Sequence, residues 1–456
     1  IPRADTWVRP YRLRATVQEE KGGGAMEFRK LPPVQEQIMK CVRCGKCRSV
    51  CPVFDEIRNE TAAPRGHVFM VQMLRDGQVS PRQEVYDRLG NCLLCETCSV
   101  NCPSGINVHE LNAAARSYIY EQNPSIGKEL IFDTMWTKPG LLRTSTKIMS
   151  GLQKLGLQSF ARNTGLTRML PGDLPRAEKI MSSIPSQPAR SRLRKINRAR
   201  GEKKYTVGYF LGCGTDILNP NVALATVDVL TRNGCDVLIP QDMKCCGLPH
   251  IANGKMDTAR LLAIHNIKIF NSYKLDYIIS DCASCTSALS RKNMEFLLGG
   301  LKIEDEAFEF SDKVMDLTRF LVEVIDIKLP VVNKDDENIR VTYHDPCHLA
   351  NAQGIKEQPR ELLKRIPGVD FVEMADANRC CGGSGTYSLT HYDLSMKILD
   401  RKMDNVMVTG ADKIATCCPS CSMQLRHGIS RHNYKGEVIH PVELVSQSYP
   451  KTLPAK

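Results

Sequence analysis

The second half of the chain alternates short apolar segments with longer amphipathic ones, and it does so twice. A short apolar run bounded by turn residues predicts a buried strand, whereas apolar residues three and four apart predict a helix. The first round predicts three strands separated by two helices: Val207–Leu211, Asn221–Asn233, Asp236–Ile239, Lys255–Tyr273 and Tyr277–Ser280. The second round repeats this order: Arg340–Tyr343, Ile355–Arg365, Asp370–Glu373, His391–Val408 and Lys413–Ala415. Strands that alternate with helices form parallel sheets, so we expect two duplicated α/β domains, at residues 201–330 and 331–456.

The first 200 residues carry a different pattern. Residues 26–120 have helical periodicity and two dense cysteine runs, which predict an α-helical, ferredoxin-like domain. Residues 121–200 contain several prolines and no cysteine, which predicts connecting helices followed by a linker. Residues 1–25 precede Met26, where we expect translation to begin, and we interpret them as a non-native or disordered extension.

Cysteine usage indicates the compartment. The chain has 456 residues, 20 of them cysteine, and it shows neither a long apolar run nor the apolar core of a secretory signal. We therefore expect a cytoplasmic protein whose thiols stay reduced. In that setting so many cysteines indicate metal or redox chemistry rather than a disulfide framework.

Positive charge is concentrated before the first repeat. The formal net charge is +12, and eight basic residues lie between Ser186 and Lys204 against one acid, Glu202. This run predicts a solvated linker, with docking to an acidic partner or to the anionic inner face of a membrane as the alternative. No aromatic residues interleave with the charges, so nucleic acid is not an expected partner.

Two cysteine runs near the N-terminus have the spacing of bacterial ferredoxins. Each reads C-x2-C-x2-C-x3-C-P, the first ending at Pro52 and the second at Pro103. Three cysteines two residues apart can wrap one face of a [4Fe–4S] cubane, and the fourth lies too far along the chain and binds the other cluster. This predicts two ligand sets: Cys41, Cys44, Cys47 and Cys102 for the first cluster, and Cys92, Cys95, Cys98 and Cys51 for the second. Arg65, between the runs, is either a cation near a cluster or a solvated side chain after a helix-starting proline.

Each α/β repeat carries five cysteines in matching positions, 134 to 136 residues apart. The sets are Cys213, Cys245, Cys246, Cys282 and Cys285 in the first repeat, and Cys347, Cys380, Cys381, Cys418 and Cys421 in the second. Several follow predicted strands, and the carboxyl ends of parallel strands are where such sheets build their sites. The glycine after each vicinal pair permits a backbone that aims both thiols at one site. Five thiolates exceed the four that zinc or one cubane requires, which favours an atypical iron–sulfur cluster, with zinc in one repeat as the alternative.

Other cysteines and histidines lie near these motifs. Cys235 and Cys417 have no counterpart in the other repeat and are expected to be packed thiols. His250, His344 and His348 are expected to be structural, with tuning of a cluster or proton relay as the alternative.

The two ferredoxin runs followed by two CCG domains resemble one family of proteins. It contains the iron–sulfur subunit of glycolate oxidase and subunits of D-lactate dehydrogenase, of anaerobic glycerol-3-phosphate dehydrogenase and of heterodisulfide reductase. The resemblance runs from about residue 30 to residue 445. Glycolate oxidase subunits tend to lose part of the last C-x2-C, whereas Cys418-Pro419-Ser420-Cys421 is complete here. A complete set is more similar to heterodisulfide reductase, whose cysteine-rich domains hold noncubane [4Fe–4S] clusters.

The resemblance implies an electron-transfer subunit of a flavin-dependent D-2-hydroxyacid oxidoreductase that acts on glycolate or D-lactate. No Gly-x-Gly-x-x-Gly follows a predicted strand, so FAD is expected on a partner dehydrogenase subunit. Electrons would leave to a membrane quinone or cytochrome, or to an electron-transfer flavoprotein. The alternative is a catalytic subunit that reduces a disulfide at noncubane clusters, with Cys245, Cys246, Cys380 and Cys381 as candidate catalytic residues.

Overall fold

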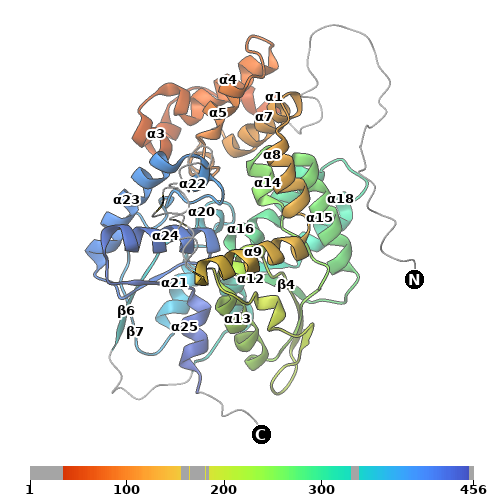
Figure 1. The fold of residues 1–456 in the computed structure, drawn as a ribbon, viewed down its shortest axis with the longest axis vertical. Helices are drawn as coiled ribbons and strands as arrows, with labels where there is room; N and C mark the ends of the chain where they lie inside the picture. The colour runs from red at the N-terminus through yellow and green to blue at the C-terminus, as the bar shows by residue number, and fades with distance from the viewer. Residues whose placement is uncertain (1–33, 156–163, 165–179, 181–183, 330–337, 451–456) are drawn as a thin grey trace.

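A computed structural model describes residues 34–155, 164, 180, 184–329 and 338–450 of the chain (Figure 1). The predicted extension at residues 1–25 and the predicted start at Met26 lie outside the described residues. Figure 1 shows a helical part at one end, in red and orange, and two α/β repeats beside each other, in green and blue.

The helical part is built around three packed helices. Helices α4 and α5 both pack on α7, and their apolar faces bury Val71, Leu74, Leu89 and Leu111 in one core. Shorter helices carry the two cysteine runs. The elements are α1 (Val34–Met39), α2 (Lys46–Ser49), α3 (Pro52–Ile57), η3 (Glu60–Ala62), α4 (Pro64–Arg75), α5 (Gln83–Gly90), α6 (Thr97–Val100) and α7 (Val108–Gln122).

The first repeat contains a five-stranded sheet in the order β1-β3-β2-β4-β5. All neighbouring pairs are parallel except β1 with β3. Its strands are β1 (Ile196–Asn197), β2 (Tyr205–Tyr209), β3 (Cys235–Leu238), β4 (Tyr277–Ser280) and β5 (Val314–Asp316). Its helices are α12 (Cys213–Leu218), α13 (Pro220–Arg232), α14 (Leu248–Ala252), α15 (Met256–Asn271), α16 (Ala283–Ala288), α17 (Arg291–Leu298), α18 (Glu304–Asp312), α19 (Leu317–Arg319) and η8 (Phe320–Val324).

The second repeat contains a four-stranded, entirely parallel sheet in the order β7-β6-β8-β9. Its strands are β6 (Ile339–Tyr343), β7 (Val369–Phe371), β8 (Lys413–Ala415) and β9 (Glu437–Ile439). Its helices are α20 (Cys347–Ala350), α21 (Glu357–Lys364), α22 (Tyr387–Thr390), α23 (Tyr392–Thr409), α24 (Pro419–His432) and α25 (Pro441–Ser448). The predicted parallel α/β organisation is therefore confirmed in both halves.

The basic run before the first repeat is not a free linker. Residues Ile196 and Asn197 pair with β3 as an edge strand, so this part is attached to the first repeat instead of being a free linker, although most of its side chains are exposed as predicted. The reason is that its arginines find carboxylate and carbonyl partners on the repeat. Arg190 is buried against Asp216 and donates to the carbonyl of Pro240, and Arg198 pairs with Asp236.

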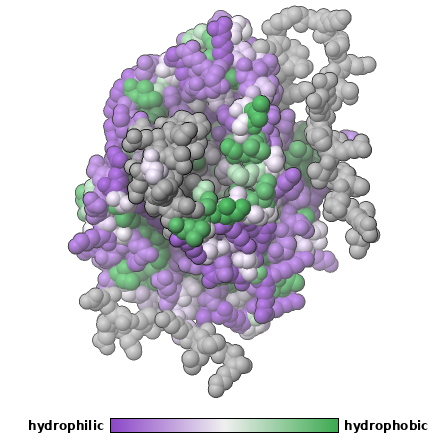
Figure 2. All heavy atoms as spheres, in the orientation of Figure 1, coloured by the Kyte–Doolittle hydropathy of each residue, from purple (hydrophilic) through white to green (hydrophobic). Residues whose placement is uncertain are grey.

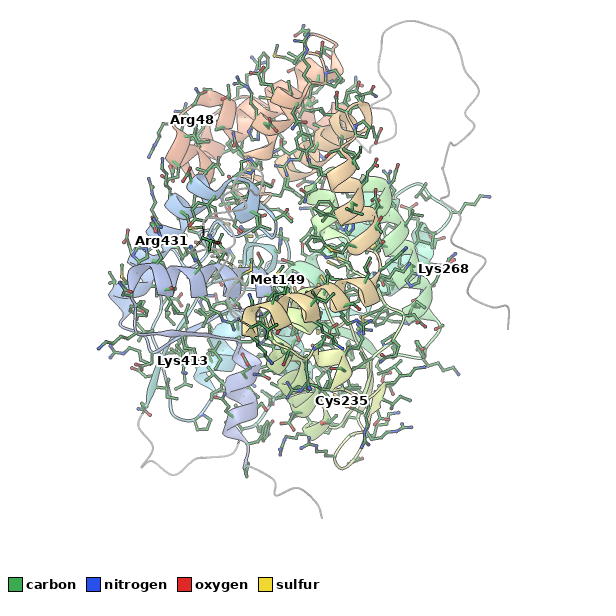
Figure 3. The ribbon with its side chains drawn as sticks, in the orientation of Figure 1. Arg48, Met149, Cys235, Lys268, Lys413 and Arg431 are labelled. Carbon is green, nitrogen blue, oxygen red and sulfur yellow. The ribbon has the colours of Figure 1, made fainter. Side chains whose placement is uncertain are left out.

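The connecting helices after α7 expose an apolar strip. They are α8 (Ile126–Lys128), η4 (Glu129–Met135) and α9 (Pro139–Lys154). The exposed apolar side chains are Ile126, Leu130, Ile131, Leu141, Ile148, Met149, Leu152 and Leu155. Figure 2 shows this strip as green atoms across the face of the molecule, and Figure 3 labels Met149 within it. No described helix is long and apolar enough to cross a membrane.

The two repeats exchange their last helices. Helix α25 of the second repeat packs on α13 of the first, and α19 with η8 of the first packs on α21 of the second. The nitrogen Nε2 of His440, which caps α25, lies 3.0 Å from the carbonyl oxygen of Asp281. This exchange places the strand ends of the two sheets against each other.

Candidate iron–sulfur sites

The two ferredoxin-type runs fold into the same loop. In each run the residue two places after the first cysteine has a left-handed backbone, Arg43 at φ 54° and Leu94 at φ 54°. Two residues later the backbone is left-handed again, at Gly45 (φ 85°) and Glu96 (φ 60°). These turns curl the chain, so the three closely spaced cysteines of each run face one side.

The first predicted set of thiols comes together. Cys41, Cys44, Cys47 and Cys102 line one small cavity of about 30 Å³. Burial raises the pKa of Cys47, and the neighbouring thiols of the same set raise it further. Arg65 lies over this loop, where its Nη1 donates to the carbonyl of Arg43 while its guanidinium pairs with Glu60. Pro64 begins α4 as expected, and the Arg65 side chain is partly exposed beside the first set of thiols. An effect of Arg65 on a cluster stays a prediction.

The second predicted set also comes together. Cys51, Cys92, Cys95 and Cys98 line a separate cavity of about 20 Å³. Burial and then the neighbouring Cys92 raise the pKa of Cys51 to about 12. The fourth cysteine of each run therefore lies with the three cysteines of the other run, as the spacing predicts. Ligation of iron by these sets stays a prediction.

The chemistry of these donor sets fits iron–sulfur clusters. The four predicted thiols of each set line one cavity, and Cys98 of the second set also lines the first cavity. Burial beside other thiols disfavours the thiolate form in the protein alone. A bound cation reverses this effect and holds the coordinating thiols deprotonated. All 20 cysteines are free, so none of these thiols is committed to a disulfide.

In each α/β repeat three of the five cysteines lie close to the carboxyl ends of strands, and the other two form the vicinal pair in a loop. Cys213 and Cys347 begin the helices after β2 and β6, and Cys282 and Cys418 precede the helices after β4 and β8. The glycines after the vicinal pairs, Gly247 and Gly382, have φ of 90° and 84°. Both glycines therefore have a left-handed backbone, which residues with a side chain rarely adopt.

The pKa values of the vicinal cysteines are shifted in the same way in both repeats. Hydrogen bonding with Cys245, and then with Cys285, holds the pKa of the Cys246 thiol well below its usual value. The corresponding bonds with Cys380 and Cys421 do the same for Cys381. In each CCG motif the pKa of the second cysteine is therefore lowered, whereas the pKa of the first cysteine is raised by its hydrogen bonds to neighbouring thiols.

The two cysteine-rich sites share one cavity, which the sequence did not predict. The cavity measures about 270 Å³ and is lined by cysteines of both repeats: Cys213, Cys246, Cys282, Cys285, Cys347, Cys380, Cys381, Cys418 and Cys421. The thiols of Cys282 and Cys418 are in hydrogen-bonding contact, and the backbone N–H of Ala283 donates to the carbonyl of Cys417 at 2.8 Å. Cys245 lies behind this lining, 4.0 Å from Cys213 between the Sγ atoms.

The second ferredoxin-type set lies directly against the second cysteine-rich set. Cys51, Cys95, Cys347 and Cys380 belong to the same packed cluster. Asn351 fixes the junction by donating to the carbonyl of Cys95 at 2.9 Å. The four sets of thiols therefore form a continuous series from the helical part to the cavity between the repeats.

Cys235 and Cys417 lie outside these sets. Cys235 is at the amino end of β3, the opposite end of the strand from the one that leads to the vicinal pair, and Figure 3 labels it. Cys417 accepts from the hydroxyl of Tyr343 and corresponds to Asp281 of the first repeat, which accepts from Tyr209. Both cysteines are buried within the core of the repeats.

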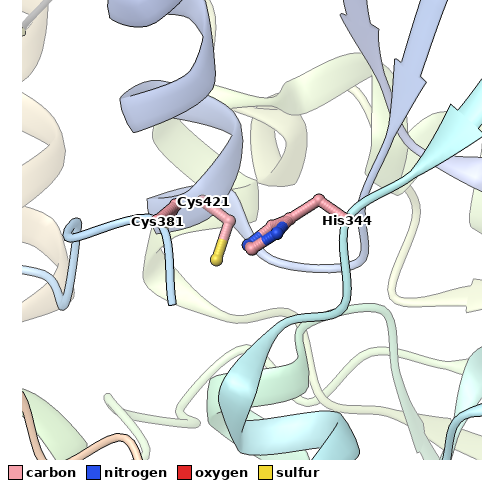
Figure 4. Close-up of side chains that lie close together, drawn as sticks. All are labelled: His344, Cys381 and Cys421. Carbon is pink, nitrogen blue, oxygen red and sulfur yellow. The ribbon is translucent and has the colours of Figure 1, made fainter. Parts of the chain in front are cut away.

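The three histidines differ in their surroundings. The Nε2 of His250 lies 2.8 Å from the carbonyl oxygen of Phe132, and the ring nitrogens of His348 lie within 3.3 Å of Ser284 and Leu94. His344 instead faces Cys381 and Cys421 (Figure 4). Sequence reasoning also missed Lys402, whose buried ammonium lies behind the second cysteine-rich set. Its only sequence signal is a lysine on the apolar face of the predicted helix.

Three family models match the chain. A 4Fe-4S dicluster domain matches residues 37–106, a glycolate oxidase iron-sulfur subunit linker region matches residues 124–181, and a cysteine-rich domain matches residues 207–290 and 341–426. These matches define an iron–sulfur protein with a dicluster domain and two cysteine-rich domains.

The chain is similar to several named proteins. The probable glycolate oxidase iron-sulfur subunit of Bacillus subtilis is 31% identical, over 90% of this chain and 94% of its own length. A heterodisulfide reductase subunit of Methanosarcina acetivorans is 26% identical, over 93% and 97%. Lactate utilization protein A of an Exiguobacterium species is 28% identical over 53% of this chain and 97% of its own length. The chain belongs to the family that contains the glycolate oxidase iron–sulfur subunits and this heterodisulfide reductase subunit.

Proposed function

We propose that this chain is the iron–sulfur subunit of a flavin-dependent oxidoreductase that oxidises a D-2-hydroxyacid such as glycolate or D-lactate. The observation that carries the proposal is the continuous series of four thiol sets. It begins at Cys41, passes through the Cys51 and Cys347 sets, and ends at the Cys213 set. The names of the glycolate oxidase and lactate utilization relatives support this substrate class.

When bound, iron–sulfur clusters would supply one-electron carriers at these four positions. Oxidation of one hydroxyacid to its 2-oxo acid releases two electrons and two protons. The flavin of a partner chain would accept them as a pair, and the thiol sets would then hold the carriers that take electrons away singly. The protein's own contribution is to fix the spacing of the four sets and to exclude water from the buried ones.

Two features support a partner subunit. The sequence contains no glycine-rich dinucleotide fingerprint after a strand, so the flavin belongs to another chain in this proposal. The exposed apolar strip on α8, η4 and α9 is the kind of surface that partners cover. The electron acceptor would be a membrane quinone or cytochrome, or an electron-transfer flavoprotein.

The second candidate function is disulfide reduction at the shared cavity. The observation that favours it is that one apolar cavity is lined by both complete cysteine-rich sets. Of the candidate catalytic cysteines, Cys246, Cys380 and Cys381 line the cavity, whereas Cys245 does not. A disulfide placed there would take up two electrons and two protons and leave as two thiols.

The test is electron paramagnetic resonance on the complex isolated anaerobically from its native host. Spectra before and after addition of glycolate or D-lactate are compared with spectra after addition of a thiol–disulfide substrate. Reduction of the clusters by a hydroxyacid, with a flavoprotein co-purified, is the expected result. No response to either hydroxyacid, together with a cluster signal perturbed by the disulfide, would overturn the proposal in favour of the second function.

A further inference from the structure

The two cysteine-rich sites differ at one position that faces the metal-binding thiols. The residue three places before the first cysteine of each set is Phe210 in the first repeat and His344 in the second. The backbones correspond, because the N–H of Phe210 donates to Ile279 and that of His344 donates to Ala415, each on the neighbouring strand. Phe210 stacks on Phe270 in the core, with ring centroids 5.7 Å apart.

His344 points into the second site. A ring nitrogen of His344 and the Sγ atoms of Cys381 and Cys421 all lie within 4.8 Å of one another. Figure 4 shows the three side chains close together, with the His344 ring directed toward the two cysteines. The side chain is completely buried, with 0% exposure. Neither ring nitrogen has a hydrogen-bond partner of ordinary geometry among the described residues.

A buried imidazole nitrogen that makes no hydrogen bond of ordinary geometry destabilises the fold unless another interaction compensates for it. The nearest groups that could satisfy it are the thiols of the second set and whatever those thiols bind. Imidazole nitrogen is a good ligand for both iron and zinc, and histidine replaces cysteine on one iron of some iron–sulfur centres, where it raises the potential.

A second difference between the repeats should also raise the reduction potential of the second site relative to the first. Lys402 lies on α23 where the first repeat has Asn266 on α15. The buried ammonium of Lys402 donates to the carbonyls of Asp376 and Ala377, in the loop that leads to Cys380. The amide of Asn266 donates to the carbonyl of Cys245 and carries no charge. The second site is therefore built with less negative surroundings than the first.

We propose that His344 is a nitrogen ligand of the metal centre in the second cysteine-rich site, and that the first site has no such ligand. This makes the two duplicated sites chemically unequal, with the second, which lies against the ferredoxin-type sets, the easier one to reduce. The proposal rests on occupancy of the second site by metal, as the proposed function requires.

The test uses the full-length chain with its metals, prepared with natural-abundance histidine or with ¹⁵N-histidine and reduced chemically. Pulsed electron paramagnetic resonance measures the coupling of histidine nitrogen to the cluster spins. A strongly coupled nitrogen that responds to the isotope, and that is lost in His344→Gln and His344→Phe, is the expected result. If metal analysis finds zinc in the site, X-ray absorption at the zinc edge should show a nitrogen neighbour that His344→Gln removes.

His348 is the matched control, because it adjoins Cys347 of the same site while both of its ring nitrogens have partners. His348→Gln should keep the coupled nitrogen. The proposal is overturned if no histidine nitrogen is directly bound in the unsubstituted chain, or if the coupling survives in His344→Gln. The unsubstituted chain decides the matter even where a His344 variant does not fold. Because the chain is reduced chemically and not by a hydroxyacid, this experiment still tests the role of His344 if the proposed function is wrong.

Discussion

Cys51 and Cys102 end their runs next to a proline, yet each lies with the thiols of the other run. Cys51 caps α3, where its Sγ accepts from the N–H of Phe54, and it faces Cys92. Substitution Cys51→Ser should therefore damage the second ferredoxin-type centre while the first, around Cys41, stays intact. The loss should amount to at most one cubane, or about four irons per chain.

Iron analysis and the two cubane signals would measure this effect. Cys235→Ser is the control, because Cys235 is buried at the far end of the first sheet and should leave the iron content unchanged. Loss of the first signal in Cys51→Ser, with the second retained, would show that each run binds its own cluster.

Lys402 is the other residue whose effect can be isolated. Burial lowers its pKa to about 8, which leaves the ammonium mostly charged at neutral pH. Lys402→Met should lower the reduction potential of the second cysteine-rich site, because it removes a buried positive charge. It should also cost about 1 to 3 kcal/mol of stability, because two carbonyls lose their donor. A redox titration followed by spectroscopy and a thermal melt would measure both effects.

The control is Lys397→Met, an exposed lysine on the same helix, for which neither quantity should change. An unchanged potential in Lys402→Met would mean that the ammonium is screened from the site.

At the scale of elements, the CCG motif depends on one left-handed glycine in each repeat. Gly382 and Gly247 have nearly the same φ, but a Cβ at Gly382 would lie 2.7 Å from the carbonyl oxygen of Ser395. A Cβ at Gly247 would meet its nearest neighbour, Ala259, at 3.4 Å, which is ordinary contact. Gly247→Ala should cost about 1 to 2 kcal/mol for the backbone alone. Gly382→Ala should cost more and should release metal from the second site.

Thermal melts and metal analysis of the two variants, run side by side, would compare these costs. If Gly382→Ala and Gly247→Ala lower the stability equally, α23 shifts away from the new Cβ at residue 382 with no cost in free energy.

Much of this element structure could be predicted from the hydrophobic pattern. Tyr277–Ser280 and Lys413–Ala415 match β4 and β8, and the other predicted strands and helices shift by no more than two residues at either end. The three-residue strands β5 and β9 were not predicted, although β7 and β8, which are equally short, were. The edge strand β1 was missed because charge dominates the run that contains it. In each case the neighbouring sheet, rather than local sequence, determines the strand.

The grouping of the thiols was predictable for a different reason. Cysteine spacing is a local signal, and it gave the two ferredoxin-type groups and the membership of each CCG set. The shared cavity was not predictable, because it depends on the exchange of α25 and α19 between the repeats, and that exchange is made by apolar contacts far apart in sequence. His344 was expected to be structural because only the fold reveals that its ring faces thiols instead of a carbonyl.

At the scale of the whole molecule, the helical part is held against both repeats. Arg116 on α7 is buried and donates to the carbonyls of Leu89 and Cys92 within the helical part and of Ala252 in the first repeat. On the other side, Asn351 of the second repeat donates to the carbonyl of Cys95. The helical part thus touches both repeats. Among the described residues, the packed cluster that contains Cys51 and Cys95 includes cysteines of the second repeat and none of the first.

This arrangement predicts an order of reduction. Electrons that enter at the ferredoxin-type sets should reach the Cys213 set only through the Cys347 set, because Cys95 adjoins Cys347. In Cys347→Ser both cubanes should still be reduced by the partner and its hydroxyacid, while reduction of the first cysteine-rich site should slow by at least tenfold, which is about 1.4 kcal/mol in the barrier. Rapid freeze-quench spectroscopy would resolve the sites in time, with Cys235→Ser as the control. An unchanged rate at the first site would mean that it has its own route to the donor, and the two repeats would then act in parallel instead of in series.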